Sequence, residues 1–250
     1  MEFSISPDTL ESAACQAWPA LEEEQLRGWT LRFANGYTKR ANSASPTGAA
    51  GDLSPAEIAH IEGRYRARGL VPTFRLVGAM RSAVVDALLD ERGYRLVDPS
   101  LVMVRPLERG APEVLLDLIE DPAAWLQGFE RITGMASNVD GRHLQILRAI
   151  SGPRAMAVLR QPAGTAGDPI CCGLGVVVRR LVGLFDVATA PDFRGRGLAT
   201  RLCEGLMGWG LSRDAEAAYL QVSSSNVAAI SVYERLGFRR AYAYWYRVLR

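Results

Sequence analysis

The sequence predicts an α/β (α+β) fold in which a mixed, mostly antiparallel sheet is flanked by helices. Apolar alternation in the second half of the chain predicts a meander of three strands, at residues 154–159, 170–178 and 181–190. A glycine-containing turn then leads into a helix with apolar residues at helical spacing. A further strand, helix and aromatic strand complete the chain, so strands and helices alternate as in other α/β proteins.

The composition is that of an ordinary soluble protein. Of 250 residues, 48% are hydrophobic and 22% are charged, and the formal net charge is +2. This charge favours neither nucleic acid nor an anionic membrane as a partner. The first ten residues lack the pattern of a signal peptide, and no apolar run approaches the roughly 18 residues that span a bilayer. We expect a cytoplasmic protein, and the sequence leaves its oligomeric state open.

Histidines and cysteines lack the spacing of a metal site. His60 and His143 are the only histidines and lie far apart. The cysteines form no Cys-x-x-Cys pair; they are Cys15, Cys171, Cys172 and Cys203. We interpret them as small apolar residues and expect no metal ion.

The first half begins with a helix and then a strand at residues 29–33. Asn35-Gly36 is typical of a hairpin turn, so residues 37–42 are expected to form the return strand. Residues 44–52 are small and include glycine, proline and serine, which indicates a loop.

A capping box at Ser54 and Glu57 predicts the start of the next helix, which runs toward Gly69. Further along, the pattern predicts a strand, a helix and a strand, at residues 73–77, 81–92 and 94–104.

A weak internal repeat relates residues 88–95 to residues 232–239, with Gly93 and Gly237 in register and a strand after each. Leu89 stands where the second copy has Tyr233. We interpret the first half as a degenerate copy of the second.

Prolines and a glycine at residues 106–112 indicate the boundary, which gives predicted domains at 1–108 and 112–250. Beyond it, helical patterns are expected at residues 112–117 and 125–132, and residues 140–150 fit a strand or a helix.

The strand at residues 181–190 leads to a glycine turn. β-Branched Val187 and Thr189 favour the strand, which stops at Pro191 because proline has no backbone N–H to donate. Gly195 and Gly197 let the backbone approach a ligand closely.

The helix that follows this turn begins with N–H groups that lack intrahelical acceptors, and such a helix end binds anions. Arg194 and Arg196 add positive charge nearby. A dinucleotide fingerprint would need glycine at Thr200, and a nucleotide P-loop would need a lysine where the chain, whose only lysine is Lys39, has none.

A second motif lies at residues 226–238. Asn226 and Tyr233 are seven residues apart, about two helical turns, so their side chains share a helix face. Gly237 is a left-handed helix stop, and Leu236 and Phe238 flank it as an apolar clasp.

Together the two motifs resemble the GCN5-related N-acetyltransferases. That family's acetyl-coenzyme A loop has the pattern Arg/Gln-x-x-Gly-x-Gly/Ala, which Arg194, Gly197 and Ala199 fill. The family's second motif, Asn-x-x-Ala-x-x-x-Tyr followed by Leu-Gly-Phe, resembles residues 226–238.

The resemblance implies acetyl-coenzyme A as the donor and a primary amine of a small molecule or peptide as the acceptor. The diphosphate would lie on the backbone N–H groups of the loop, from Arg194, Gly195, Arg196, Gly197, Leu198, Ala199 and Thr200. The amides of the acyl arm would pair with the strand edge at Val187, Ala188 and Thr189. Tyr233 would protonate the leaving thiolate, and Asn226 would orient the arm or the Tyr233 region.

The base is left open. Some relatives have a glutamate five residues before the asparagine, where this chain has Gln221, and glutamine cannot accept a proton. Asp186 is a candidate, but alternation places it on the strand face opposite Phe185 and Val187, so we interpret it as structural. A water chain or capture of a neutral amine also fits.

Each assignment has a structural alternative. Tyr233 fits core packing, and Asn226 fits a helix cap. The alternative for the whole protein is a module that binds acyl-coenzyme A without turnover.

Overall fold

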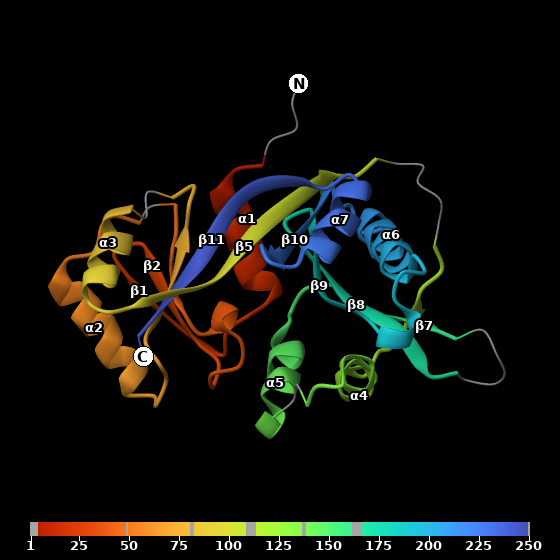
Figure 1. Cartoon of the computed structure of the whole chain (residues 1–250), viewed down its shortest axis with the longest axis horizontal. Helices are drawn as coiled ribbons and strands as arrows, with labels where there is room; N and C mark the ends of the chain where they lie inside the picture. Colours follow the sequence, from red (N-terminus) through yellow and green to blue (C-terminus); the bar gives the residue numbers. More distant parts are fainter. Residues whose placement is uncertain are drawn as a thin grey trace. The chain divides into compact units, whose positions relative to one another are not determined.

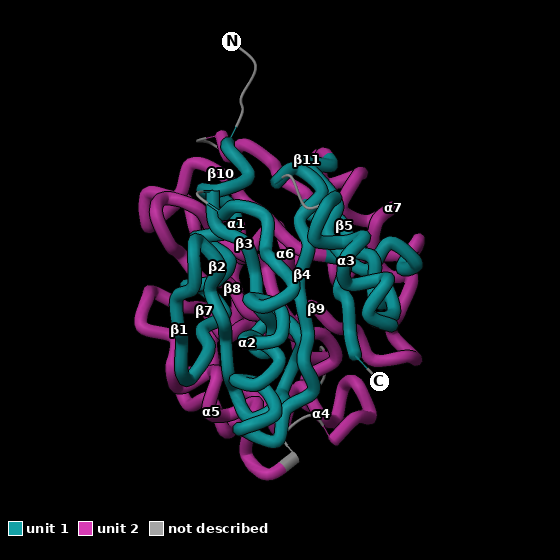
Figure 2. Tube along the Cα trace, turned by 90° about the vertical axis from the view of Figure 1, so that its left-hand side faces the viewer, with its two compact units in different colours: residues 1–102, 222–226, 240–250 teal, residues 103–221, 227–239 magenta. Residues whose placement is uncertain are grey.

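The computed structural model describes residues 5–48, 50–80, 83–108, 114–136, 139–161 and 167–249. The chain divides into two compact units (Figure 2). Unit 1 comprises Met1–Val102, Val222–Asn226 and Arg240–Arg250, and unit 2 comprises Met103–Gln221 and Val227–Arg239. The predicted boundary segment falls partly on residues 109–113, which lie outside the described residues.

Unit 1 is built from five strands and the helices between them, in the strand order β1-β2-β3-β4-β11. Its elements are α1 (Pro7–Ala17), β1 (Glu22–Leu26), β2 (Trp29–Phe33), η1 (Lys39–Ala41), β3 (Ala44–Pro46), α2 (Pro55–Arg66), β4 (Thr73–Val77), α3 (Ala83–Glu91) and β11 (Arg239–Val248). The strand β5 (Arg95–Pro106) begins in unit 1 and ends in unit 2. The capping box is confirmed, because Ser54 Oγ accepts from the Glu57 N–H at 3.3 Å and Glu57 Oε2 accepts from the Ser54 N–H at 2.8 Å.

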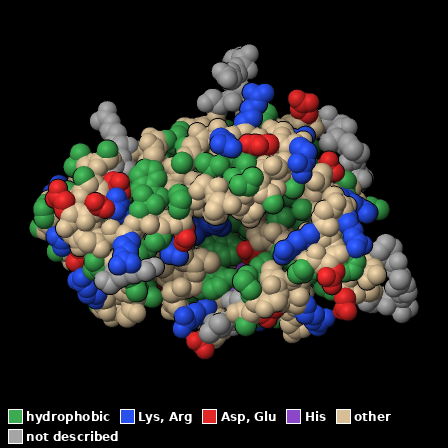
Figure 3. All heavy atoms as spheres, in the orientation of Figure 1, with side chains coloured by type: hydrophobic (Ala, Val, Ile, Leu, Met, Phe, Trp, Pro, Cys, Tyr) green, Lys and Arg blue, Asp and Glu red, His purple; other side chains and the backbone are tan. Residues whose placement is uncertain are grey.

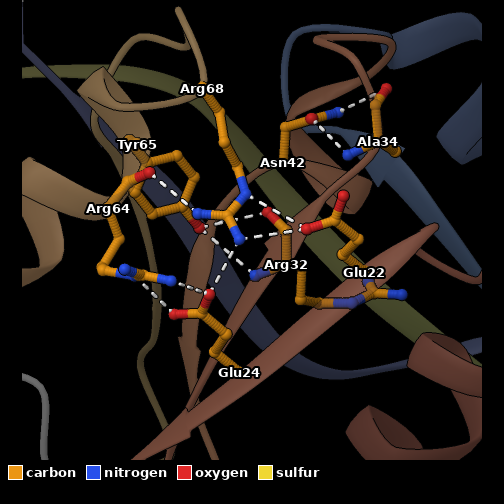
Figure 4. A network of polar contacts seen from close by, with 8 residues as sticks. All are labelled: Glu22, Glu24, Arg32, Ala34, Asn42, Arg64, Tyr65 and Arg68. Carbon is orange, nitrogen blue, oxygen red and sulfur yellow. Dashed lines mark hydrogen bonds and ion pairs between the residues drawn. The ribbon is translucent and has the colours of Figure 1, made fainter.

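The end of α2 is tied to the β1–β2 hairpin by polar contacts (Figure 4). The hydroxyl of Tyr65 bonds the backbone N–H and C=O of Arg32, at 3.3 and 3.2 Å. On the solvent side, Arg64 bonds Glu24, and the Arg68 guanidinium lies 4.0 Å from the centre of the Phe33 ring. These contacts fix the register of the helix on the sheet, while the apolar side of α2 is buried in the unit 1 core.

The predicted hairpin at Asn35-Gly36 is wrong. The Asn42 side chain accepts hydrogen bonds from the N–H groups of Ala34 and Gly36, at 2.7 and 2.9 Å, and donates to the carbonyls of residues 37 and 38. One amide side chain thus satisfies the backbone of this segment, which folds as a compact loop instead of a strand.

The partner of β2 is β1, and the turn between them is at Arg27 and Gly28, with Leu26 opposite Trp29. On its other side β2 pairs with β3, so the prediction of a loop over residues 44–52 is wrong at its first three residues.

A buried ion pair joins α1 to β4. Glu11 and Arg75 are 5% and 3% exposed, and their side chains form two hydrogen bonds, one of them of 3.0 Å from Arg75 Nη2 to Glu11 Oε1. The Tyr242 hydroxyl donates to the same carboxylate at 2.7 Å, and the Arg75 guanidinium lies 3.8 Å from the centre of the Tyr244 ring. Each charge therefore has partners in a water-poor environment.

Unit 2 has the strand order β10-β9-β8-β7-β6. Its elements are β6 (Asp117–Leu118), α4 (Pro122–Thr133), η2 (Val139–Gly141), α5 (Arg142–Ala149), β7 (Arg154–Arg160), β8 (Pro169–Val178), β9 (Leu181–Thr189), η3 (Pro191–Phe193), α6 (Leu198–Leu211), β10 (Ala217–Ser223) and α7 (Val227–Arg235). Figure 1 shows α6 on one face of β8 and β9, and α4 and α5 on the other.

The meander, the glycine turn and both following helices are confirmed. Residues 140–150 are mainly helical, as α5. The prediction of a helix at residues 112–117 is wrong for its described part, because residues 114–116 are irregular and Asp117 starts the short edge strand β6. The face in Figure 3 carries basic and acidic side chains side by side, in keeping with the small net charge.

The last strand of the chain belongs to unit 1. Although β11 follows α7 of unit 2, it pairs antiparallel with β4, from Tyr244 opposite Val77 to Val248 opposite Thr73. Conversely, the end of β5 lies in unit 2, where the Leu107 N–H donates to the carbonyl of Glu216 at 2.8 Å. The chain thus crosses between the units more than once.

Candidate active site

The turn between β9 and α6 presents backbone N–H groups at a helix end. Gly195 and Gly197 have φ of +73° and +74°, the left-handed region that favours glycine. A Cβ built at either glycine would meet no atom within 4 Å, so the backbone there is open to approach. Gly197 is the residue before α6, and no side chain caps this helix among the described residues. The N–H groups of residues 198–200 are therefore available to an anion.

The two predicted arginines brace this turn. Arg194 Nε donates to the carbonyl of Thr189 at 3.2 Å, which ties the turn to the end of β9. Arg196 Nη2 donates to the carbonyl of Asp192 at 2.9 Å, and its guanidinium lies 5.1 Å from the centre of the Phe193 ring. Both side chains remain exposed, so they add positive charge beside the helix end.

The strands β9 and β10 pair in parallel and then separate. Their ladder runs from Leu181 opposite Ala217 to Leu184 opposite Leu220, and no further pair is found among the described residues. β9 continues to Thr189 with β8 on its other side. The stretch 187–189 thus has one edge that β10 does not occupy, at the carboxyl ends of two parallel strands, where α/β proteins bind ligands.

A β-bulge lies where the two strands separate. Across the β8–β9 ladder, Leu174 is opposite Phe185 and Cys172 is opposite Ala188, so β9 has one extra residue between these pairs. Asp186 takes up the difference with φ of +49°. A bulge re-aims a side chain out of strand alternation.

Val187 and Asp186 lie on opposite faces of β9, as alternation predicts. A Cβ at Gly173 would lie 2.9 Å from Leu202 of α6 and 3.3 Å from Val187, so Val187 faces α6. Asp186 instead reaches α5 on the other face, where its Oδ2 lies 3.1 Å from His143 Nε2.

Phe185 shares the face of Asp186. Gly175, opposite Leu184, faces α6, so the next strand residue, Phe185, faces away from that helix. The prediction that Asp186 lies opposite Phe185 is wrong, because the bulge interrupts the alternation on which it rested.

His143 is a functional candidate that the sequence reasoning missed. Its side chain is fully buried, and its ring meets the Phe129 ring edge to face at 5.6 Å. The signal was present, because His143 occupies the apolar positions of α5 with Ile146 and Leu147, at i, i+3 and i+4.

Tyr233 is half-buried on α7 and packs against Phe238, with ring centres 6.0 Å apart. Burial raises the pKa of Tyr233, and ionisation of the nearby Cys203 and Cys171 thiols acts in the same direction. Cys171 Sγ in turn lies 3.3 Å from Thr189 Oγ1. The raised pKa keeps the Tyr233 phenol protonated at neutral pH.

Two other predicted residues, Gln221 and Asn226, lie on β10 and just before α7. Gln221 lies on β10 just past the last pair with β9. Asn226 immediately precedes α7, and its role stays a prediction.

Within the described ranges, no group of three or more His, Cys, Asp or Glu side chains could hold a metal ion. No helix of the described chain has both the length and the apolar character needed to cross a membrane.

Comparison with known proteins gives matches along nearly the whole chain. A family model described as "Probable histone acetyltransferase Rv0428c C-terminal" matches residues 8–247. "Probable histone acetyltransferase Rv0428c" of Mycobacterium tuberculosis is 32% identical over 238 residues, which are 92% of this chain and 70% of that protein. "Uncharacterized N-acetyltransferase YobR" of Bacillus subtilis is 25% identical over 249 residues, or 96% of this chain and 98% of that one.

The fold also resembles a solved structure, the "GCN5-related N-acetyltransferase from Kribbella flavida". The TM-score is 0.68 at 13% identity, and the alignment covers 96% of this chain and 94% of that chain.

Proposed function

This chain belongs to the family of GCN5-related N-acetyltransferases, and we propose that it transfers an acetyl group from acetyl-coenzyme A to a primary amine. The acceptor we propose is an amine of a small molecule or a peptide. The observation that carries the proposal is the uncapped end of α6 beside the open edge of β9, because one ligand with a diphosphate and an amide-bearing arm would use both.

The residues of the turn suit this donor. The N–H groups of residues 194–200 would hold the diphosphate, and the exposed Arg194 and Arg196 would add charge. The main chain of Val187, Ala188 and Thr189 would pair with the amides of the arm, as an added strand does. When bound, acetyl-coenzyme A supplies an activated acyl carbon and a thiolate leaving group.

Tyr233 would serve the leaving thiolate. A phenol with a raised pKa keeps its proton at neutral pH, so it is a hydrogen-bond donor rather than a base. The apolar surroundings that hold the phenol neutral also disfavour a thiolate, which favours passing the proton to sulfur. We therefore assign Tyr233 the role of the acid.

Replacing Tyr233 with phenylalanine is expected to lower kcat by about 10²-fold, since a positioned acid typically contributes 10²–10⁴-fold. The ring contact with Phe238 survives this change, so the Kd for acetyl-coenzyme A and the melting temperature should stay near wild-type values. Thiol release from acetyl-coenzyme A with an amine panel measures kcat, and calorimetry measures Kd. An unchanged kcat would mean that Tyr233 packs against its neighbours and is not the acid.

The same assay separates the enzyme from the alternative, a module that binds acyl-coenzyme A without turnover. Calorimetric binding together with acetylation of at least one amine supports the enzyme. Binding without consumption of any acceptor on the panel supports the module.

We also propose that unit 1 derives from a degenerate acetyltransferase-like half. The succession β1-β2-β3-α2-β4-α3-β5 has the same order of strands and helices as β7-β8-β9-α6-β10-α7-β11. In both, two antiparallel pairings are followed by a parallel one across the first helix. The helix end that would correspond to the anion site is capped: Ser54 Oγ accepts from the Glu57 N–H, Pro55 has no N–H, and the Glu57 carboxylate places negative charge there.

Calorimetric titration is therefore expected to give a stoichiometry of about one acetyl-coenzyme A per chain, because a capped helix end that carries the Glu57 carboxylate disfavours a diphosphate. A stoichiometry of two would contradict the assignment of unit 1 as degenerate.

A further inference from the structure

The pair formed by His143 and Asp186 lies outside the two sequence motifs. The imidazole is fully buried, the carboxylate is 21% exposed, and Nε2 and Oδ2 are 3.1 Å apart. A partly exposed carboxylate that is held from behind by a buried ring can face a ligand in one fixed position.

The position of Asp186 in the strand connects this pair to the proposed reaction. Residues 187–189 are the edge that would hold the acyl arm, and the anion site lies beyond Thr189. At a rise of about 3.3 Å per residue, Asp186 is at the far end of that edge, about 10 Å from Thr189. The reacting end of an arm that starts at the anion site would lie near the bulge.

Two of the side chains packed near this pair carry no charge. From α4, the neighbour of His143 is the ring of Phe129, which does not titrate. From β8, the neighbour is Cys172, and burial raises the pKa of its thiol, with further contributions from the Cys171 thiol and from Asp186 itself. Cys172 is therefore neutral over the range in which enzymes are assayed.

We propose that Asp186 accepts the proton of the acceptor amine and that His143 is a positioning residue that holds its carboxylate. This inference rests on the proposed acetyl transfer and deepens it. It also names the acceptor class: an amine that arrives as a cation is attracted by the carboxylate and then gives up a proton to it.

The proposed step is a nucleophilic substitution at the acyl carbon. The amine nitrogen bonds to the acyl carbon, and the carbon–sulfur bond breaks with its electron pair going to sulfur. The cationic amine first gives one proton to the Asp186 carboxylate, which releases it to solvent, and the neutral nitrogen then attacks. The second proton leaves nitrogen once its bond to carbon has formed, and it takes the same route through Asp186 to solvent. The thiolate takes a proton from Tyr233, which recovers one from solvent.

The test compares Asp186→Asn with Asp214→Asn. Asp214 is another unit 2 aspartate with positive φ, of +59°, and it is exposed and far along the chain from the site residues. Asparagine tolerates this backbone region well, so neither change should prevent folding. D186N is expected to lower kcat/KM by about 10²-fold or more at pH 7 and to flatten the acid side of the pH profile, with the Kd for acetyl-coenzyme A within twofold of wild type. D214N is expected to match the wild type throughout.

A second comparison concerns His143. His143→Gln keeps an N–H donor that can reach Asp186, whereas His143→Leu keeps only the bulk. H143Q is expected to retain most of kcat, and H143L to lose about tenfold in kcat with an unchanged Kd for acetyl-coenzyme A. Equal kcat in the two variants would overturn the positioning role.

A spectroscopic readout needs no substrate. The chain has two histidines, so ¹⁵N-histidine spectra contain few signals, and H60N assigns them. D186N should change the Nε2 signal of His143, and D214N should not.

The outcomes separate the two proposals. If wild-type protein acetylates an amine and D186N retains its kcat/KM and pH profile, the role of Asp186 is overturned while acetyl transfer stands. If the wild type neither binds acetyl-coenzyme A nor acetylates any amine, the proposed function fails, and this inference fails with it.

Discussion

Replacing Gly197 with valine is expected to raise the Kd for acetyl-coenzyme A by about 30- to 100-fold. At φ of +74° a β-branched residue is strained by about 2 to 3 kcal/mol, and the turn would relax out of the conformation that presents its N–H groups. The position is open, so the effect comes from backbone conformation and not from a clash. Calorimetric titration measures it directly.

Gly208 provides the matched control, because it lies within α6, the helix that follows Gly197. It has no positive φ, and a Cβ there would meet nothing within 4 Å. G208A should leave the Kd unchanged and raise stability by about 0.5 to 1 kcal/mol. If G197V bound as tightly as G208A, the diphosphate would not be held at this turn.

Replacing Glu11 with alanine is expected to destabilise the protein by about 3 to 5 kcal/mol, because it leaves the Arg75 guanidinium charged and buried without its carboxylate. For a chain of this length that corresponds to a fall in melting temperature of roughly 10 °C. Thermal unfolding followed by circular dichroism measures the shift.

The control pair is Arg131 and Asp168, whose side chains are 64% and 88% exposed at 3.5 Å. D168A should change stability by less than about 0.5 kcal/mol. The double change E11L/R75M should cost less than E11A alone, since it removes both charges. If the melting temperature of E11A equals that of the wild type, the buried pair contributes nothing to stability.

Features set by local sequence were predicted well. The capping box at Ser54 and the meander before the turn depend on residues within a few positions of one another, and the structure has them. The predictions failed where the conformation of a segment depends on one side chain or on a partner that is distant in the sequence. Asn42 satisfies a loop where the Asn35-Gly36 pattern indicated a hairpin, and β11 finds its partner β4 more than 150 residues back along the chain.

The predictions for the site also succeeded where local sequence decides and failed where it does not. The open turn around Gly197 follows from its own sequence, and so does the helix that carries Tyr233. The bulge at Asp186 adds one residue to a strand that alternates regularly on both sides. Strict alternation therefore placed Asp186 on the wrong face relative to Phe185. His143 comes from a helix 43 residues earlier in the chain, and only the fold brings it to that strand.

The place of β11 has a consequence for how the protein is made. During synthesis β4 emerges from the ribosome well before β11, because the residues that pair with it are translated more than 150 residues later. Unit 1 cannot complete its sheet until β11 has emerged. Nascent chains would therefore expose an unfinished strand edge over that interval, the state in which a chaperone has the most to protect.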